Sequence, residues 1–189
     1  MLHRRRTGTS GWLRPPNGTA SVGDTLFTLG IVAVAVAPVL DLLDAPGRVK
    51  FLDHLAASVP GAVLLGGGAV VAVVAQAQMG TAWRAGIELS ARSELVMHGL
   101  FGLVRNPFYT GMLTASAGVV LMAPNVAAVA GWLALLIGSE IDVRMVEEPA
   151  LRSAHSGSYA TYEHSTPRFL PSPRLLHHRR ERGVGRRRR

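Results

Sequence analysis

The stretch that decides the fold is residues 105–150, which read RNPFYTGMLTASAGVVLMAPNVAAVAGWLALLIGSEIDVRMVEEPA. Two apolar segments, residues 108–122 and 126–141, flank a short turn at Ala123-Pro124-Asn125. Each has about 15–16 residues and would rise roughly 24 Å as an α-helix, which is short for a hydrocarbon core of about 30 Å. The pattern therefore predicts a tight helical hairpin that dips deeply into a bilayer or barely spans it.

Two further apolar segments precede this hairpin. Residues 26–43 are apolar except for Thr28 and Asp41, and residues 55–79 form a second long run. Both have about the 20 residues that a membrane-crossing helix needs. A cleaved signal peptide is the rival interpretation of the first run, but its flank carries no convincing small-x-small cleavage site, so we expect a retained helix. In the second run, Gly66-Gly67-Gly68 predicts close helix packing, and no Lys-Ser/Thr follows it as a phosphate loop would require.

Composition supports a membrane protein. Apolar residues make up 48% of the 189 residues and charged residues only 17%, which excludes an acidic disordered chain. The chain has no cysteine, so it has no disulfide framework, thiolate nucleophile or cysteine-based metal site. Its net charge of +8 is concentrated at the two ends, which flank apolar spans. A soluble nucleic-acid binder would spread its arginines over the folded surface instead, and we expect no nucleic-acid partner.

The distribution of arginine predicts the orientation. Basic residues gather in the N-terminal arm, in residues 80–107 and in the C-terminal tail, whereas the Pro124 turn has none. The bias of Lys and Arg towards the cytoplasm then places both termini there, in a protein integral to the cell membrane. We expect an all-α, polytopic membrane helical bundle of about four transmembrane segments. Its parts would be a flexible basic arm (1–24), two transmembrane helices (25–79), a core with the hairpin and a cytoplasmic C-terminal helix (80–171), and a disordered basic tail (172–189).

Two polar clusters lie where the hairpin begins and where it ends. The first contains Arg105-Asn106-Pro107 and Tyr109, and the second contains Arg144 and Glu147-Glu148. Since a hairpin brings its own entry and exit together, Arg105 and the glutamate pair should be neighbours although about 40 residues separate them. Polar groups beside a bilayer are costly unless they are paired or functional, so this end of the hairpin is the candidate site.

Five motifs in this part of the chain occur in a recognisable order. They are Leu95-Val96, Gly99-Leu100-Phe101, Arg105-Asn106-Pro107-Phe108-Tyr109-Thr110-Gly111, Glu147-Glu148 and Gly157-Ser158-Tyr159-Ala160-Thr161-Tyr162. In this order the chain resembles the membrane methyltransferases related to isoprenylcysteine carboxyl methyltransferase and phospholipid N-methyltransferase. The resemblance covers about residues 79–171, half of the chain.

The resemblance implies S-adenosylmethionine as the methyl donor and no metal. Arginine suits the donor's carboxylate, and glutamates suit its ribose hydroxyls and its ammonium. Arg105 and Glu148 are the candidate catalytic residues, which would also orient the acceptor. The residues implied to bind the cofactor are Gly99, Arg105, Asn106, Tyr109, Gly111, Glu147 and Glu148.

The chain departs from the family pattern at two motifs. Asn106 stands where the family has His, so this position offers an amide but no protonatable base. Leu100-Phe101 replaces Pro-Tyr. An anionic acceptor needs little help from a base, so the first departure favours O- or S-methylation of an isoprenylcysteine carboxylate-like group. Membrane lipids and other amphiphilic or small acceptors stay open.

Each motif also has a structural interpretation when taken singly. Arg105 alone is typical of a headgroup anchor, Glu147-Glu148 of a solvated helix face, and the tyrosines of an interfacial aromatic belt. The alternative function is a non-catalytic membrane scaffold whose basic tail binds anionic lipid or a partner. These interpretations do not explain why the residues follow the family order.

Overall fold

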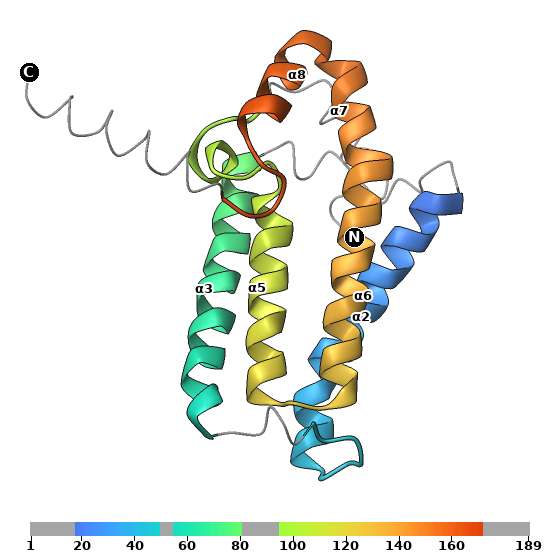
Figure 1. The fold of residues 1–189 in the computed structure, drawn as a ribbon, viewed down its shortest axis with the longest axis vertical. Coiled ribbons are helices and arrows are strands. Elements are labelled where there is room, and N and C mark those ends of the chain that lie inside the picture. The colour runs from blue at the N-terminus through green and yellow to red at the C-terminus, as the bar shows by residue number, and fades with distance from the viewer. Residues whose placement is uncertain (1–17, 50–54, 81–94, 172–189) are drawn as a thin grey trace, which may run out of the picture.

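The structure, a computed structural model, describes residues 18–49, 55–80 and 95–171. Four long helices run alternately down and up: α2 (Gly18–Leu42), α3 (Leu55–Met79), α5 (Pro107–Met122) and α6 (Val126–Asp142) (Figure 1). Short elements gather at one end of this bundle: η2 (Gly99–Gly102), a π-helical turn η3 (Val143–Glu147), α7 (Glu148–Ala154) and α8 (Ser156–Ser165). The predicted basic tail and most of the predicted arm lie outside the described residues, while α2 begins at Gly18, before the apolar run itself.

The chain forms an all-α membrane bundle, as predicted. Three helical stretches are long and apolar enough to cross a bilayer, namely Val22–Leu42, Ala57–Met79 and Val126–Ala154, and α5 is a shorter apolar helix of 16 residues. The hairpin is also confirmed, because α5 and α6 are joined at residues 123–125.

The second arm of the hairpin is longer than the apolar pattern suggested. The charges from Asp142 onward end the apolar run, but the backbone continues as a helix to Ala154. The π turn explains how the helix continues through Pro149, which has no backbone N–H to donate a hydrogen bond. There the Glu148 N–H donates to the Val143 carbonyl, five residues back, which widens the turn.

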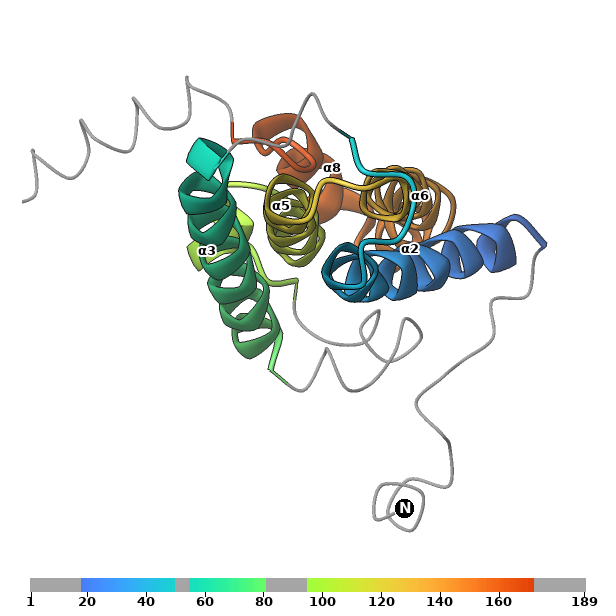
Figure 2. The ribbon, with the colours of Figure 1, turned by 90° about the horizontal axis from the view of Figure 1, so that it is seen from below.

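Glycines build the bundle as two antiparallel pairs, α2 with α6 and α3 with α5 (Figure 2). A Cβ added at Gly30 of α2 would lie 2.8 Å from the Gly131 carbonyl oxygen of α6, and one at Gly111 of α5 would lie 2.5 Å from the Ala72 nitrogen of α3. In both pairs the backbones therefore touch, as small residues permit in membranes. Each of the four helices repeats this contact glycine seven residues, or about two turns, apart. These glycines are Gly23 and Gly30, Gly61 and Gly68, Gly111 and Gly118, and Gly131 and Gly138.

Only one glycine of the triplet in α3 fulfils the packing prediction. Gly68 is buried against the α5 backbone, whereas a Cβ added at Gly66 or Gly67 would meet no other part of the described chain within 4 Å. The two pairs themselves are joined by the hairpin turn and by Trp132, whose Nε1 donates to the Leu113 carbonyl at 3.0 Å.

Asn125 closes the end of the bundle at the hairpin turn. Its side-chain oxygen accepts from the Ala128 N–H at 3.0 Å and so caps α6, while its Nδ2 donates to the Ala37 carbonyl of α2 at 2.8 Å. The backbone at Gly47 and Val49 bonds to Val126 and Pro124. This end is therefore held by backbone and amide hydrogen bonds and by an ion pair between Arg48 and Asp41 at 3.0 Å, whereas the charged groups of the predicted site lie at the other end.

Candidate active site

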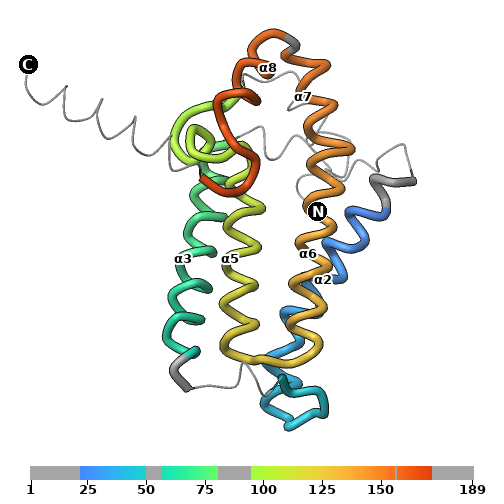
Figure 3. The backbone as a smooth tube through the Cα atoms, viewed as in Figure 1, coloured from blue at the N-terminus to red at the C-terminus, as the bar shows by residue number. Residues whose placement is uncertain are grey.

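The entry of α5 and the exit of α6 meet at the end of the bundle opposite Asn125 (Figure 3). Here Arg105 Nη2 lies 3.3 Å from Glu148 Oε1, so the proximity expected from the hairpin is observed. Both side chains are buried, with exposed fractions of 8% and 2%. The hairpin thus brings together two of the residues that the resemblance implied.

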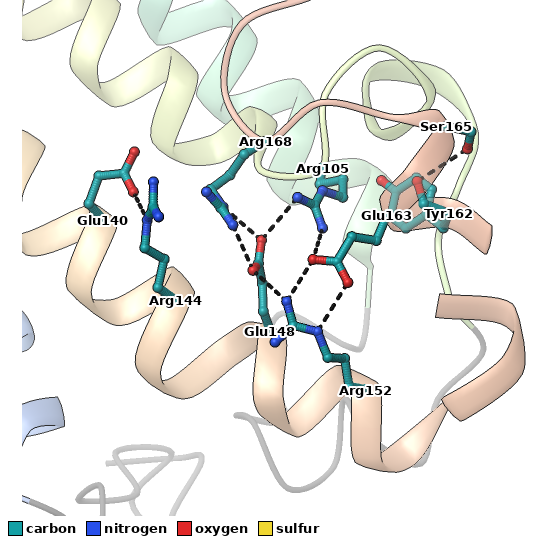
Figure 4. A network of polar contacts seen from close by, with 9 residues as sticks. All are labelled: Arg105, Glu140, Arg144, Glu148, Arg152, Tyr162, Glu163, Ser165 and Arg168. Atoms are coloured by element: carbon teal, nitrogen blue, oxygen red, sulfur yellow. Dashed lines mark hydrogen bonds and ion pairs between the residues drawn. The ribbon is translucent and has the colours of Figure 1, made fainter. Parts of the chain in front are cut away.

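Five charged side chains form what we call the arginine network (Figure 4). Arg168 donates hydrogen bonds to both carboxylate oxygens of Glu148, from Nε at 2.7 Å and from Nη2 at 2.9 Å. Arg152 reaches the same carboxylate at 3.2 Å and Glu163 at 2.6 Å, and Glu163 in turn lies 3.1 Å from Arg105 Nη1. The members are Arg105, Glu148, Arg152, Glu163 and Arg168.

The network carries an excess of positive charge. Its three guanidinium groups face two carboxylates, so one positive charge is left uncompensated within it. Hydrogen bonds from Arg152 lower the pKa of Glu163 to about 2. Hydrogen bonding to Glu148 raises the pKa of Arg168 above its ordinary value. Both shifts favour the charged forms of Glu163 and Arg168, and the excess of positive charge makes the network a ready binding region for an anion.

The neighbouring residue, Glu147, points to a different place. Tyr109 donates its hydroxyl to Glu147 Oε1 at 2.7 Å, which links the start of α5 to the π turn. Since consecutive residues of a helix project in different directions, the turn sends Glu147 to α5 and Glu148 into the arginine network. Single π turns are frequent at functional sites, because they re-aim side chains in this way.

Glu147 belongs to a second, negatively charged set of side chains. Asp142 lies close enough to Glu147 and to Asp24 of α2 for their charges to repel one another. We call Asp24, Asp142 and Glu147 the acidic group. The start of α5 thus lies between a positive region and a negative one.

Two neighbouring side chains at this site hold buried nitrogen atoms that make no hydrogen bond within the described residues. Arg105 Nε and Asn106 Nδ2 are buried and have no hydrogen-bond partner among the described residues. Both atoms are N–H donors, and a buried donor without an acceptor costs free energy. Adjacent residues at the start of α5 therefore offer two donors that an acceptor group from outside the described chain would satisfy.

The two predicted glycines lie against α3. Gly99 has φ +61°, which favours glycine, and a Cβ there would lie 2.5 Å from the Gln78 side chain. Gly111 contacts the Gly68 and Ala72 backbone. The structure assigns both glycines to helix packing, and their part in cofactor binding stays a prediction.

Sequence reasoning did not select several residues that the structure brings to this end. Arg168 lies in the segment that follows α8, and it was not a candidate site residue. Asp142 and Glu163 were not selected either. The available signal was the presence of charged residues at the end of apolar helices, which predicts function or pairing but no partner.

Comparison with known proteins now identifies the chain. A family model described as phospholipid methyltransferase matches residues 56–157, more than half of the sequence. The chain belongs to this family. No curated protein and no solved structure matches it.

The match includes the whole α5–α6 hairpin, Glu147 of the π turn and Glu148 directly after it. This phospholipid methyltransferase family member is therefore a membrane methyltransferase, which confirms the resemblance seen in the motifs. Glu163 and Arg168 of the arginine network lie beyond the matched residues.

Proposed function

We propose that this membrane methyltransferase uses S-adenosylmethionine and methylates the polar end of an amphiphilic or small acceptor. The observation that carries the proposal is the pair of unpartnered buried donors, Arg105 Nε and Asn106 Nδ2. Arg105 belongs to the arginine network with its excess positive charge, and Tyr109 in the first turn of α5 bonds to Glu147 of the acidic group. A zwitterionic ligand fits this combination, because each of its charges has a region of opposite sign.

The residues divide naturally between the parts of such a donor. Arg105 and Asn106 would hold its carboxylate, since both offer N–H groups that the described residues leave free. Glu147, fixed by Tyr109, would accept from a hydroxyl or an ammonium. The donor supplies an activated methyl group on a sulfonium, so the protein's task is mainly to align it with the acceptor.

Glu148 has a different part in this proposal. Its two oxygens already accept from Arg168 and Arg152 and face Arg105. We therefore assign Glu148 to the arginine network, without direct contact with the donor, and Arg105 to direct contact with the donor.

Binding of radiolabelled S-adenosylmethionine to the detergent-solubilised protein tests the proposal. We expect saturable binding by the wild type, a loss of tenfold or more in Asn106→Leu and Arg105→Ala, and recovery in Asn106→His, because His restores a side-chain donor. Arg144→Gln is the control, since Arg144 is exposed and pairs with Glu140 outside the network. Equal binding by all variants would overturn the site, and absence of binding by the wild type would overturn the donor.

The acceptor is proposed to carry an anionic reacting group, as in an isoprenylcysteine-like carboxylate. Asn106 provides no base to deprotonate a cationic group. The acidic group favours a second candidate, a lipid amine, because it attracts a cation and contains carboxylates that accept a proton.

Transfer of labelled methyl groups to a panel of acceptors separates the two candidates. The panel contains a prenylated cysteine analogue and phosphatidylethanolamine vesicles. Asp142→Asn should reduce transfer to the amine more than transfer to the carboxylate, because any loss of donor binding is common to both. Labelling of phosphatidylethanolamine alone would overturn the anionic acceptor.

We further propose that the site faces the cytoplasm, because arginines gather at the end of the bundle that carries it. As the chain has no cysteine, single cysteines can report on it. Gly157→Cys should react with a membrane-impermeant maleimide from the cytoplasmic side only, and Pro46→Cys from the other side only. The reverse pattern would overturn the orientation.

A further inference from the structure

The C-terminal segment beyond α8 crosses the start of α5. The Arg105 N–H donates to the Pro167 carbonyl at 2.8 Å, and the Asn106 N–H donates to the Arg168 carbonyl at 3.0 Å. Thr110 Oγ1 donates to the Phe169 carbonyl at 2.8 Å. These bonds use the backbone of residues 167–169, so they do not depend on the side chain at position 168.

The Arg168 side chain has a separate contact. It is the only described guanidinium that binds both Glu148 oxygens, at 2.7 and 2.9 Å. Arg105 approaches the same carboxylate with one nitrogen at 3.3 Å, a longer and weaker contact. Two-point binding to a carboxylate is the strongest arrangement available to arginine, so Arg168 is the main partner of Glu148.

The distances suggest a competition for Glu148. A carboxylate buried to 2% exposure requires a strong partner. Without Arg168, Glu148 would keep the exposed Arg152 at 3.2 Å and the buried Arg105 at 3.3 Å, and Arg105 would be drawn fully onto it. The guanidinium that is to bind the methyl donor would then be occupied by an internal carboxylate.

We propose that Arg168 is a positioning residue for methyl transfer, which satisfies Glu148 and thereby keeps Arg105 available to the donor's carboxylate. This inference rests on the proposed function. It extends the site past the residues matched by the family model, which end at 157, to the segment after α8.

Donor affinity in four variants tests this role. Arg168→Gln should weaken S-adenosylmethionine binding about tenfold to a hundredfold, the range seen for outer partners of ligand-binding side chains in metal sites. Arg168→Lys should lie between this variant and the wild type, because it keeps the charge and loses the two-point contact. Arg152→Gln should weaken binding less, because Arg152 reaches Glu148 with one nitrogen and is 47% exposed. Arg144→Gln should bind as the wild type does.

A double variant separates competition from general loss of structure. In Arg168→Gln/Glu148→Gln the neutral amide no longer holds Arg105, so donor affinity should recover relative to Arg168→Gln alone. A merely structural role predicts a further loss in the double variant. The KM for the donor should change in Arg168→Gln while the KM for the acceptor does not.

The outcomes distinguish this inference from the proposed function. Donor binding by the wild type and equally by Arg168→Gln would overturn the role of Arg168 and leave the proposed function intact. Equal losses in Arg168→Gln and Arg152→Gln, or no recovery in the double variant, would also overturn it. Absence of binding by the wild type would overturn both proposals.

Discussion

The two halves of this molecule are held together by opposite means. Within the bundle, glycines bring helix backbones into contact, as at Gly68 and Gly111. At the site end, charged side chains from distant parts of the sequence meet, as in the contact of Arg168 with Glu148. Backbone contact tolerates almost no added volume, whereas an ion pair tolerates small movements but depends on charge. Changes of size should therefore damage the bundle, and changes of charge should damage the site.

The largest effect is expected from added volume in the bundle. Gly68→Val places a branched side chain against the α5 backbone and should cost about 3 kcal/mol or more of unfolding free energy. The control is Gly66→Val, two residues away in the same triplet, where an added Cβ meets no other described part of the chain within 4 Å. Thermal unfolding in detergent measures both, and similar melting temperatures would contradict the glycine contacts.

Tyr109→Phe tests the link between the bundle and the site. The change removes the hydroxyl that donates to Glu147 Oε1 and should cost about 1–3 kcal/mol, since a half-buried carboxylate loses a partner. Tyr162→Phe, which removes a hydroxyl bonded to the Phe101 carbonyl, should cost about 0.5–1.5 kcal/mol. Only Tyr109→Phe should also weaken donor binding, and an unchanged donor affinity would argue against a role for Glu147.

Asn125→Ala tests the end of the bundle at the hairpin turn. It removes the cap of α6 and the bond to Ala37, and should cost about 1–2 kcal/mol. Because Asn125 lies far from the arginine network, donor affinity measured below the melting temperature should stay at the wild-type value. A change in affinity would mean that the two ends of the bundle are coupled.

The smallest effect concerns pH and Glu163. The pKa of Glu163 is lowered from 4.5 to about 2, so its stabilising contribution is complete above pH 4.5 and is lost as the pH falls through about 2. For a side chain with 26% exposure the contribution should stay below about 1 kcal/mol. Glu163→Gln should therefore lower the melting temperature slightly at pH 7 and converge with the wild type near pH 2. A constant difference across this range would contradict the ionised state of Glu163.

Much of the fold could be predicted because apolar length alone marks a membrane helix. The pairing of α2 with α6 and of α3 with α5 could not, because a glycine in the sequence does not reveal which helix it faces. Gly66 and Gly68 illustrate this, since they lie in one triplet and only Gly68 packs. The continuation of α6 past Asp142 was also missed, because charges that end an apolar run do not end a helix when they are paired.

The candidate site was predictable where local geometry sufficed. A hairpin necessarily joins its own ends, so Arg105 and Glu148 were expected to meet. Arg168 reaches the same carboxylate after a return of the chain through α7 and α8, and no local pattern encodes that return. The opposite directions of Glu147 and Glu148 likewise depend on the π turn, which has no reliable signature in the sequence.

The shortness of α5 has a consequence for the surrounding lipid. Its 16 residues rise about 24 Å, less than the roughly 30 Å of a bilayer's hydrocarbon, while α3 beside it has 25 residues. Local thinning of the bilayer is one way to relieve such a mismatch, and it draws the headgroup layer inward along the short helix. At its upper end this depression would bring lipid headgroups level with Pro107 and Tyr109. The headgroup of a lipid acceptor in this thinned region would then lie level with the site, so the acceptor would reach it without leaving the bilayer.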